Sequence, residues 1–314
     1  MNRSGSRISA ADISVVFWGY HLSGELTLKE LLRNGLRVSL VVLPCGRDTS
    51  GIENIARKRK IPVTRPRHLK KNTVFLSKLK RLAPQAFIVD SYDKLIPAEF
   101  LDIPAIGAYN FHEALLPKYR GQHIMNWALI NGEKESGLTV HRMTARFDEG
   151  GIVTQRRVRV EEWDDIDTLY EKICGTIPAA VKILAARLKK KSVRTKKQDF
   201  RKATYFHKRS PEDGRIDWNK SAKEIYYLIR ALKKPWPNAF SCLGETRVSI
   251  NDALPVDLRK RGASVPGEIL RLKKRKYPFV ICGDGRLLEI READIEPAGS
   301  ALSHMKNGMR FTRS

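Results

Sequence analysis

The sequence lacks the features that mark membrane, secreted and metal-binding proteins. No apolar run reaches the ~18 residues that a membrane-spanning helix needs, so we expect no membrane span. Residues 1–12 are small and polar without an apolar centre, which is unlike a secretory signal peptide. No pair of cysteines has the CxxC spacing of a zinc or redox site. Scattered cysteines predict a cytoplasmic protein in which all four are reduced and buried as small hydrophobic side chains: Cys45, Cys174, Cys242 and Cys282.

The glycine patterns of the common nucleotide-binding sites are also absent. Gly19 and Gly24 follow the first predicted strand, but their spacing is neither GxGxxG nor GxxxxGK(S/T). We therefore expect neither a dinucleotide-binding site nor a P-loop.

Acidic residues are scarce. The 314 residues include 34 Asp and Glu against 59 Lys and Arg, which gives a formal net charge of +25. Such an excess predicts attraction to phosphates, nucleotides or acidic surfaces but says nothing about the fold. The basic runs RKRK, KKKSVRTKK and RLKKRK are equally consistent with a solvated surface and with contacts to nucleic acid.

The first part of the chain alternates short apolar runs with amphipathic segments. The runs at 13–17, 37–44, 61–63, 86–90 and 108–112 are rich in apolar residues, as expected of buried strands. Short alternation of strand and helix predicts an α/β domain with a mostly parallel, Rossmann-like sheet. Ligands of such sheets bind at the carboxyl ends of the strands. A single long helix is predicted at 165–189, kinked at Pro178.

A change of composition separates this domain from a second one. Residues 189–203 are almost all basic or polar and are typical of a linker. A helix at 221–232 begins with a capping box, and short strand-like runs with tight turns follow it. Such strands predict a small, OB-like β-barrel. We therefore expect four parts: a flexible tail at 1–12, a catalytic domain at 13–188, a linker at 189–203 and a barrel-like domain at 204–314.

Three polar residues follow or end strands and suit one chemistry. Asn110 and His112 are two residues apart on a predicted strand, so they point to the same face. Asp148 follows another strand and precedes Gly150 and Gly151, a turn that lets the backbone approach a ligand. An amide can donate to a developing oxyanion, a histidine can transfer a proton, and a carboxylate beside it favours the imidazolium.

Other interpretations of these residues stay open at this level. An Asn-x-His pair on a strand can be structural, and sequence alone does not place Asp148 beside it. His123 and His141 are interpreted as packing or surface histidines, and no His or carboxylate cluster predicts a metal. There is no GxSxG motif and no cysteine in this block, so we expect direct transfer without a covalent enzyme intermediate.

The block resembles the folate-dependent formyltransferase family. That family combines an Asn-x-His strand, a loop of the type (S/A)-L-L-P-(K/R)-(Y/W/F)-(R/K)-G and a downstream Asp-x-Gly. This chain has Asn110-Phe111-His112, then ALLPKYRG at 114–121, then Asp148-Glu149-Gly150. The similarity extends through TYFHKRSPEDGRIDW and LIRALKKPWPNAF and covers most of residues 13–295. The second domain resembles the C-terminal barrel-like domain of the family.

The resemblance implies 10-formyltetrahydrofolate as donor, a primary amine as acceptor and no metal. Asn110 and protonated His112 would stabilise the oxyanion, His112 would donate a proton to the leaving nitrogen, and Asp148 would keep His112 charged and oriented. The pterin would lie against the backbone after the strand at 86–90, the LLP loop would form a wall, and the loop before Asp148 would close over it. The implied folate-binding residues are Lys94, Leu95, Ile96, Leu115, Leu116, Pro117, Thr144, Ala145, Arg146 and Phe147.

The acceptor has two candidates within this resemblance. The block is most similar to the branch that formylates 4-amino-arabinose on UDP, which carries an Arg where this chain has Gln122. The chain lacks the decarboxylase half that can accompany that branch, so we expect a stand-alone formyltransferase. Methionyl-tRNA formyltransferase is the alternative, favoured by the +25 charge and by the basic linker as a possible tRNA contact, and opposed by a short loop after the second strand. The hydrolase domain of 10-formyltetrahydrofolate dehydrogenase is a further relative with both domains. A non-catalytic RNA-binding relative is the alternative from another class, and the intact Asn110, His112 and Asp148 argue against it.

Overall fold

The computed structural model describes residues 13–233, 237–259, 265–295 and 299–312, so the tail predicted at 1–12 lies outside the described residues. The chain folds as two compact units. The first contains Met1–Gly121, Glu135–Val158 and Glu171–Tyr205, and the second contains Gln122–Lys134, Arg159–Tyr170 and Phe206–Ser314.

The N-terminal unit is built on a seven-stranded sheet with the strand order β3-β2-β1-β4-β5-β7-β8. Neighbours from β3 to β5 pair in parallel, while β5 and β7 are antiparallel. The predicted α/β class with a mostly parallel sheet is therefore confirmed. The strands are β1 (Ser14–Gly19), β2 (Arg37–Val42), β3 (Val63–Thr64), β4 (Ala86–Asp90), β5 (Gly107–His112), β7 (Glu135–Arg142) and β8 (Ile152–Arg159).

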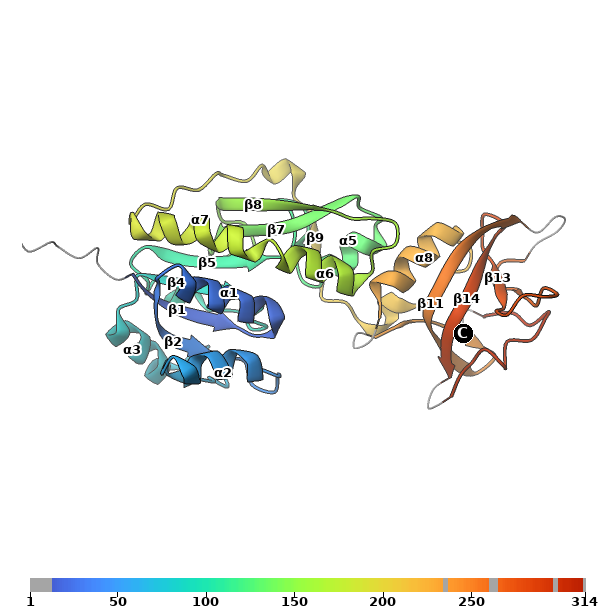
Figure 1. The fold of residues 1–314 in the computed structure, drawn as a ribbon, viewed down its shortest axis with the longest axis horizontal. Helices are drawn as coiled ribbons and strands as arrows, with labels where there is room; N and C mark the ends of the chain where they lie inside the picture. Colours follow the sequence, from blue (N-terminus) through green and yellow to red (C-terminus); the bar gives the residue numbers. More distant parts are fainter. Residues whose placement is uncertain (1–12, 234–236, 260–264, 296–298, 313–314) are drawn as a thin grey trace, which may run out of the picture. The chain divides into compact units, whose positions relative to one another are not determined.

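Helices cover both faces of this sheet because its central strands are apolar on both sides. Strand β1 is buried along its whole length, as is β4. On one face α1 (His21–Arg33) contacts α2 (Ser50–Lys58) and α7 (Ile177–Lys189), and Figure 1 shows α1 and α7 running alongside the strands. On the other face α3 (Thr73–Leu82) and α4 (Ala98–Leu101) pack Phe75, Leu79 and Phe100 against Trp18 and Phe87.

The strand order reverses at β1, which lies between β2 and β4. In open α/β sheets this reversal creates a crevice at the carboxyl ends of the strands, where ligands bind. Here those ends are Gly19 of β1, Asp90 of β4 and His112 of β5. The backbones of β1 and β4 approach closely at this edge, since a Cβ on Gly19 would lie 2.2 Å from the carbonyl oxygen of Asp90.

The prediction of a single helix at 165–189 is wrong. The chain forms two helices, α6 (Ile166–Cys174) and α7, separated by Gly175 and Thr176. Pro178 stands in the first turn of α7, where its missing N–H has no helical partner to lose. Proline therefore starts a new helix here, where a kink inside one helix was predicted.

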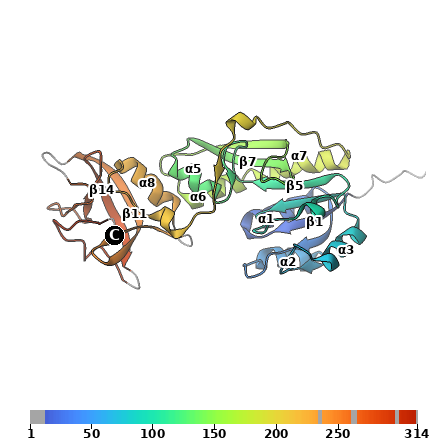
Figure 2. The ribbon, with the colours of Figure 1, turned by 180° about the vertical axis from the view of Figure 1, so that it is seen from behind.

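The C-terminal unit contains a five-stranded antiparallel sheet with the order β10-β11-β14-β13-β12, which forms a half-barrel. Its strands are β10 (Ala239–Leu243), β11 (Thr246–Arg259), β12 (Ile269–Leu270), β13 (Phe279–Ile281) and β14 (Arg286–Ile295). Register shifts along the pairing of β11 with β14 mark bulges, which let long strands bend. Helix α8 (Ala222–Ala231) packs on β11 and β14, as the view from behind in Figure 2 shows, and on α5 (Ile124–Ile130). The predicted barrel-like second domain is thus confirmed as a half-barrel.

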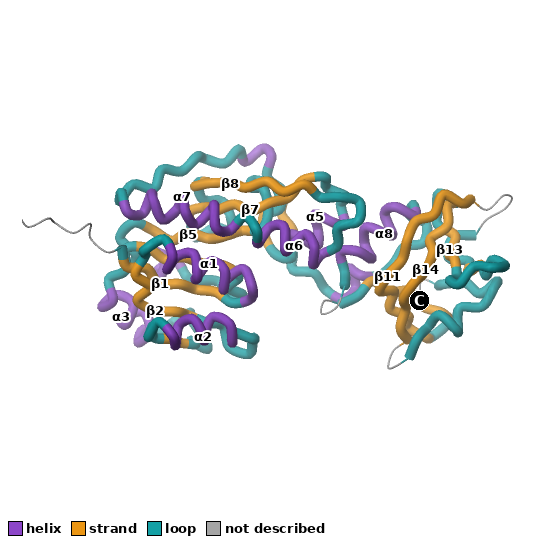
Figure 3. Tube along the Cα trace, viewed as in Figure 1, coloured by secondary structure: helices purple, strands orange, loops and turns teal. Residues whose placement is uncertain are grey.

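The chain between α7 and Tyr205 is mainly loop with one short helical turn, η1 (Phe200–Lys202), as Figure 3 shows. It ends at β9 (Tyr205–Phe206), which pairs with β6 (Arg120–Gly121). Among the described residues no helix is long and apolar enough to cross a membrane. The prediction that all four cysteines are buried is wrong for Cys45, which is exposed, and for Cys242, which is partly exposed.

Candidate active site

Strand β5 places the first two predicted residues at the carboxyl edge of the sheet. Asn110 and His112 alternate with the fully buried Tyr109 and Phe111, so both point to the same side of β5. Asn110 lies opposite His141 of β7 in the antiparallel register, and Asn110 is half-buried. The edge of β5 therefore presents an amide and an imidazole side by side.

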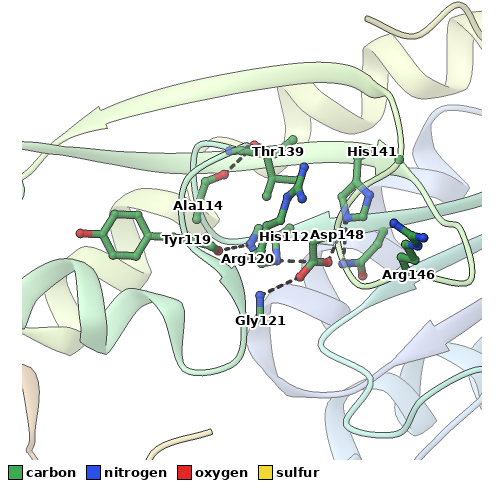
Figure 4. Close-up of polar contacts among 12 residues, drawn as sticks. His112, Ala114, Tyr119, Arg120, Gly121, Thr139, His141, Arg146 and Asp148 are labelled. Atoms are coloured by element: carbon green, nitrogen blue, oxygen red, sulfur yellow. Dashed lines mark hydrogen bonds and ion pairs between the residues drawn. The ribbon is translucent and has the colours of Figure 1, made fainter. Parts of the chain in front are cut away.

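His112 is 4% exposed, and acceptors face both of its ring nitrogens. Nε2 lies 2.7 Å from the carbonyl oxygen of Tyr119, so it carries a proton and donates. Nδ1 lies 3.7 Å from Oδ1 of Asp148. Figure 4 shows the ring between these two partners. A proton on each ring nitrogen satisfies both contacts, and the Nε2–H is a donor that an oxyanion can accept.

Asp148 is brought to His112 by a tight turn after β7. Its φ is +54°, and a Cβ on the following Gly150 would lie 1.7 Å from the carbonyl oxygen of Arg142, so this turn requires glycine. The Gly121 N–H donates to Oδ2 of Asp148 at 2.9 Å. Burial raises the pKa of the Asp148 carboxyl, but the His112 charge, the contact with His141 and the Gly121 N–H outweigh it. The pKa of Asp148 therefore lies well below its ordinary value, and the group is a carboxylate at neutral pH.

His141 is a site residue that the sequence analysis missed. It is 2% exposed, and its Nε2 lies 3.4 Å from Oδ1 of Asp148 and 3.4 Å from Nδ2 of Asn110. It packs inside as predicted, yet it joins the amide to the carboxylate. Its position opposite Asn110 comes from the antiparallel pairing of β5 with β7, for which no local sequence pattern exists.

The LLP loop is fixed by hydrogen bonds to the sheet. The hydroxyl of Thr139 donates to the carbonyl of Ala114 at 2.5 Å and accepts from the Leu116 N–H at 3.2 Å. The side-chain amide of Gln155 donates to the carbonyl of Leu116 at 2.7 Å. Leu116 is buried, whereas Leu115 and Pro117 keep part of their surface open.

The remaining predicted folate-binding residues lie in two segments. After β4, the Lys94 ammonium donates to the carbonyls of Pro66 and Arg67, Leu95 is 62% exposed, and the side chain of Ile96 packs in the core. Only backbone atoms of Ile96 are thus available to a ligand. Before Asp148, the loop residues Thr144, Ala145, Arg146 and Phe147 are all exposed, Phe147 by 54%.

A partly buried network of hydrogen bonds connects Gln198, in the loop after α7, to the turn of Asp148. The side-chain N–H₂ of Gln198 donates to the carbonyls of Asp148 and Gly150 at 2.6 and 2.7 Å. Its oxygen accepts two hydrogen bonds from Arg120, which is 0% exposed. Arg120 also contacts Tyr205, whose hydroxyl donates to Glu149 at 2.8 Å. Residues 189–203, predicted to be a linker, therefore supply the residue that holds the backbone of the turn.

Among the described residues no group of three His, Cys, Asp or Glu side chains is placed to hold a metal ion. The site consists of an amide, two imidazoles and one ionised carboxylate. These groups can stabilise negative charge on an oxygen and supply one proton.

Comparison with known proteins gives the same picture for both units. A family model described as formyl transferase matches residues 14–181, and one described as formyl transferase, C-terminal domain, matches residues 208–308. The bifunctional polymyxin resistance protein ArnA of Wigglesworthia glossinidia brevipalpis is 37% identical over 289 residues, which cover 90% of this chain but only 43% of that protein. The methionyl-tRNA formyltransferase of Caldanaerobacter subterraneus subsp. tengcongensis is 34% identical over 288 residues, covering 88% of this chain and 92% of the relative.

Two solved structures share the fold across both units. WlaRD, a sugar 3N-formyl transferase crystallised with dTDP and 5-N-formyl-THF, has a TM-score of 0.68 and 18% identity, covering 89% of this chain and 97% of its own. The N-formyltransferase from Helicobacter canadensis, in complex with folinic acid and dTDP-3-aminofucose, has a TM-score of 0.69 and 19% identity, covering 89% and 99%.

Proposed function

Since the chain belongs to the formyl transferase family, with both the N-terminal and the C-terminal domain, we propose that it moves the formyl group of 10-formyltetrahydrofolate to the primary amine of a nucleotide-linked amino sugar. Folate-dependent formyl transfer is the activity of the family. The observation that carries its chemistry here is the convergence of Asn110 and His112 on an ionised Asp148. The donor in its 10-formyl form, the roles of these residues and the acceptor are our proposals.

The folate supplies the formyl carbon, whose oxygen gains negative charge when the amine attacks. The amide of Asn110 donates to this oxygen, and the His112 imidazolium lies on the same side of β5 to stabilise it. Asp148 keeps the imidazolium charged and fixed in its plane. His112 then supplies the proton that the leaving nitrogen takes up, after its Nε2–H exchanges the Tyr119 carbonyl for the reacting group.

Two exposed apolar side chains support a flat, partly apolar donor at this edge. Leu95 and Phe147 are among the large hydrophobic side chains that remain exposed, and they come from the two segments predicted to hold the pterin. Exposed apolar side chains that flank polar groups are typical of a ligand-binding surface. Backbone atoms of residues 94–96 and the loop at 144–147 would hold the ring, with Leu115 and Pro117 as part of the wall.

The nucleotide-linked amino sugar is our first choice of acceptor because the chain shares the LLPKYRG loop and the HRM segment with the branch acting on UDP-4-amino-arabinose. The ArnA relative is slightly more similar than the tRNA-formylating one, at 37% against 34% identity. This chain spans less than half of ArnA, so only formyl transfer is carried over. Gln122 replaces the arginine of that branch, which predicts a weaker hold on an anionic group at this point.

Initiator methionyl-tRNA is the second candidate, and one observation favours it. The last residue of α7 and the segment after it carry six exposed cations within nine residues: Lys189, Lys190, Lys191, Arg194, Lys196 and Lys197. Cations spaced along an extended segment suit a phosphate backbone, and each phosphate contact makes affinity more dependent on salt.

The deciding experiment offers the purified chain 10-formyltetrahydrofolate with either UDP-linked 4-amino sugars or charged initiator methionyl-tRNA. Release of tetrahydrofolate is measured at rising salt. Turnover with the sugar nucleotide alone supports the proposal, and turnover with tRNA alone, falling steeply with salt, supports the second candidate. Binding of folate without turnover of either would point to another amine, and no folate binding would overturn the proposal.

Variants separate the two candidates further. Replacement of Lys190, Lys191 and Arg194 by Glu should abolish tRNA turnover and leave a sugar-nucleotide reaction intact. The matched control is the same replacement of Lys78, Lys80 and Arg81, which are exposed on α3. His112→Ala tests the non-catalytic alternative, because an RNA-binding protein would keep its affinity while an enzyme would lose turnover.

A further inference from the structure

Two acidic side chains that have no role in the mechanism proposed above meet at the carboxyl edge beside His112. Asp90 ends β4, and Glu113 directly follows His112 at the end of β5. Asp90 is 1% exposed, whereas Glu113 keeps part of its surface open. Asp90 ends the strand beside β1, where the strand order reverses, and Glu113 follows the next strand at the same carboxyl edge, where α/β sheets bind their ligands.

A single hydroxyl joins the two carboxyl groups. Oγ of Ser91 lies 3.2 Å from Oδ1 of Asp90 and 3.1 Å from Oε1 of Glu113. A hydroxyl has one hydrogen and can donate to only one of them. The other contact is favourable only if that carboxyl group is protonated and donates to Ser91. The geometry therefore indicates one shared proton for two carboxyl groups.

Neighbouring groups fix which side of the pair is open. The hydroxyl of Thr27 donates to Oδ2 of Asp90 at 2.6 Å, and Ser23 contacts Ser91 at 2.9 Å, both from α1. These contacts close the Asp90 side. Glu113 keeps part of its surface open whereas Asp90 does not, so Glu113 is the member of the pair that an acceptor can reach.

The electrostatics of the pair agree with one shared proton. Burial raises the pKa of Asp90 to about 6, against the hydrogen bonds from Thr27 and Ser91. Burial and the Asp90 charge raise the pKa of Glu113 to about 7, against His112. Among the described residues, Tyr20 before α1 is a further ionisable group that interacts with Glu113, and it lies beside the ion pair of Arg47 and Asp93.

We propose that Glu113, sharing one proton with Asp90 through Ser91, accepts the proton that the acceptor's ammonium group must lose before it can attack. This role rests on the proposed function. An amine is protonated at neutral pH and has no lone pair for attack, so a base at the acceptor side is required. A carboxyl group that titrates near neutrality fits the task, and it binds the cationic form of the acceptor beforehand.

The proton balance of the reaction agrees with this role. The ammonium group holds three protons and the formamide product holds one on the same nitrogen. One proton is taken up by the leaving nitrogen of the folate, in step with His112. The other passes to Glu113 while the new carbon–nitrogen bond forms, and the acid pair returns it to water after the product leaves.

The first test is the pH dependence of Glu113→Gln in the full chain, with whichever acceptor the wild type turns over. Glutamine keeps the shape and the contact with Ser91 but takes up no proton. We expect kcat/KM for the acceptor to fall about 100-fold at neutral pH. The loss should shrink as the pH rises, since the acceptor then arrives as the free amine, and KM for the folate should not change.

Asp90→Asn and a surface variant complete the series. Asp90→Asn removes the negative charge beside Glu113. This should lower the pKa of Glu113 and move the rising limb of the pH profile of kcat/KM to lower pH. Glu135→Gln, which removes a carboxylate paired with Arg157 at the exposed end of β7, is the matched control and should change nothing. A loss in Glu113→Gln that is equal at every pH would mean a structural role and overturn the inference, as would unchanged kinetics.

A second readout does not depend on turnover. Infrared difference spectra of the protein alone, taken across neutral pH, should show carboxylic acid C=O absorption that titrates, that weakens in Glu113→Gln, and that titrates at lower pH in Asp90→Asn. Absence of this band in the wild type would overturn the shared proton. A wild type that formylates no amine would overturn the proposed function and this role with it, whereas wild-type turnover with unaltered Glu113→Gln would overturn only the role.

Discussion

The exchange Asp148→Asn removes the negative charge that faces His112 and His141 but keeps the size of the side chain. Oδ1 of Asp148 lies 3.7 Å from Nδ1 of His112. Two unit charges at this distance interact by about 4.5 kcal/mol at an effective dielectric constant of ~20. If the imidazolium is needed in the transition state and not for binding, this loss corresponds to about a 1000-fold decrease in kcat.

The assay is steady-state release of tetrahydrofolate, with KM measured for both substrates. We expect kcat to fall and both KM values to stay within a few-fold, because the contacts of the carboxylate are with His112, His141 and the Gly121 N–H. Glu149→Gln is the matched control, since it removes the neighbouring charge of the same turn, which pairs with Arg120 at 3.6 Å and not with a histidine. A kcat for Asp148→Asn above one-tenth of wild type, or an equal loss in Glu149→Gln, would refute this reasoning.

Four further predictions concern the same fold. Asn110→Ala should reduce kcat about 100- to 1000-fold by removing an oxyanion donor, with no effect on folate binding measured by fluorescence titration. Gln198→Leu should lower stability by about 3 kcal/mol in urea unfolding, because Arg120 loses a buried partner. Gln198→Glu should restore the acceptor for Arg120 and with it the stability. It should not restore kcat, because a glutamate side chain no longer donates to the turn of Asp148. Ser221→Ala should cost about 1 kcal/mol by loss of the cap of α8, seen in the same unfolding assay without loss of activity. The folded-state pKa values of Asp90 and Glu113, about 6 and 7, lie above unfolded values of about 3.9 and 4.3. The folded state therefore binds more protons, and stability falls by about 5 kcal/mol as the pH rises from 4 to 7. Glu113→Gln should melt several degrees above wild type at pH 8 and much closer to it at pH 5, and equal melting temperatures at pH 8 would contradict this.

Much of the fold could be predicted from local patterns. The apolar runs at 13–17, 37–44 and 86–90 became β1, β2 and β4, because strands buried on both faces need uninterrupted apolar residues. The boundary at Pro178 was misplaced, since a proline is compatible both with a kink and with the first turn of a new helix. Tertiary packing of α7 against α1 decides between these, and no pattern inside the segment reports it.

The site was predictable only in part. Asn110 and His112 share a face by the strand period, and the glycines after Asp148 indicated a tight turn. From the sequence, the contact between Asp148 and His112 could be expected only through the resemblance to a family. In the structure, the fold of the sheet brings the two side chains together. His141 and Gln198 were not predicted, because one looked like an ordinary core residue and the other stood in a basic segment typical of a linker.

The sequence by itself determined the class of fold, the family and the chemistry of the reacting groups, since these depend on residue types and on spacing along one strand or loop. The tertiary structure decided which of these groups touch. Asn110 meets His141 from 31 residues away, Gln198 holds the Asp148 turn from 50 residues away, and Thr27 reaches Asp90 across 63 residues. Such contacts arise from strand order and from the packing of separate segments, and each depends on the whole sheet being formed. The acid pair of Asp90 and Glu113 exists for the same reason, because the ends of two parallel strands bring together side chains that are unrelated in sequence.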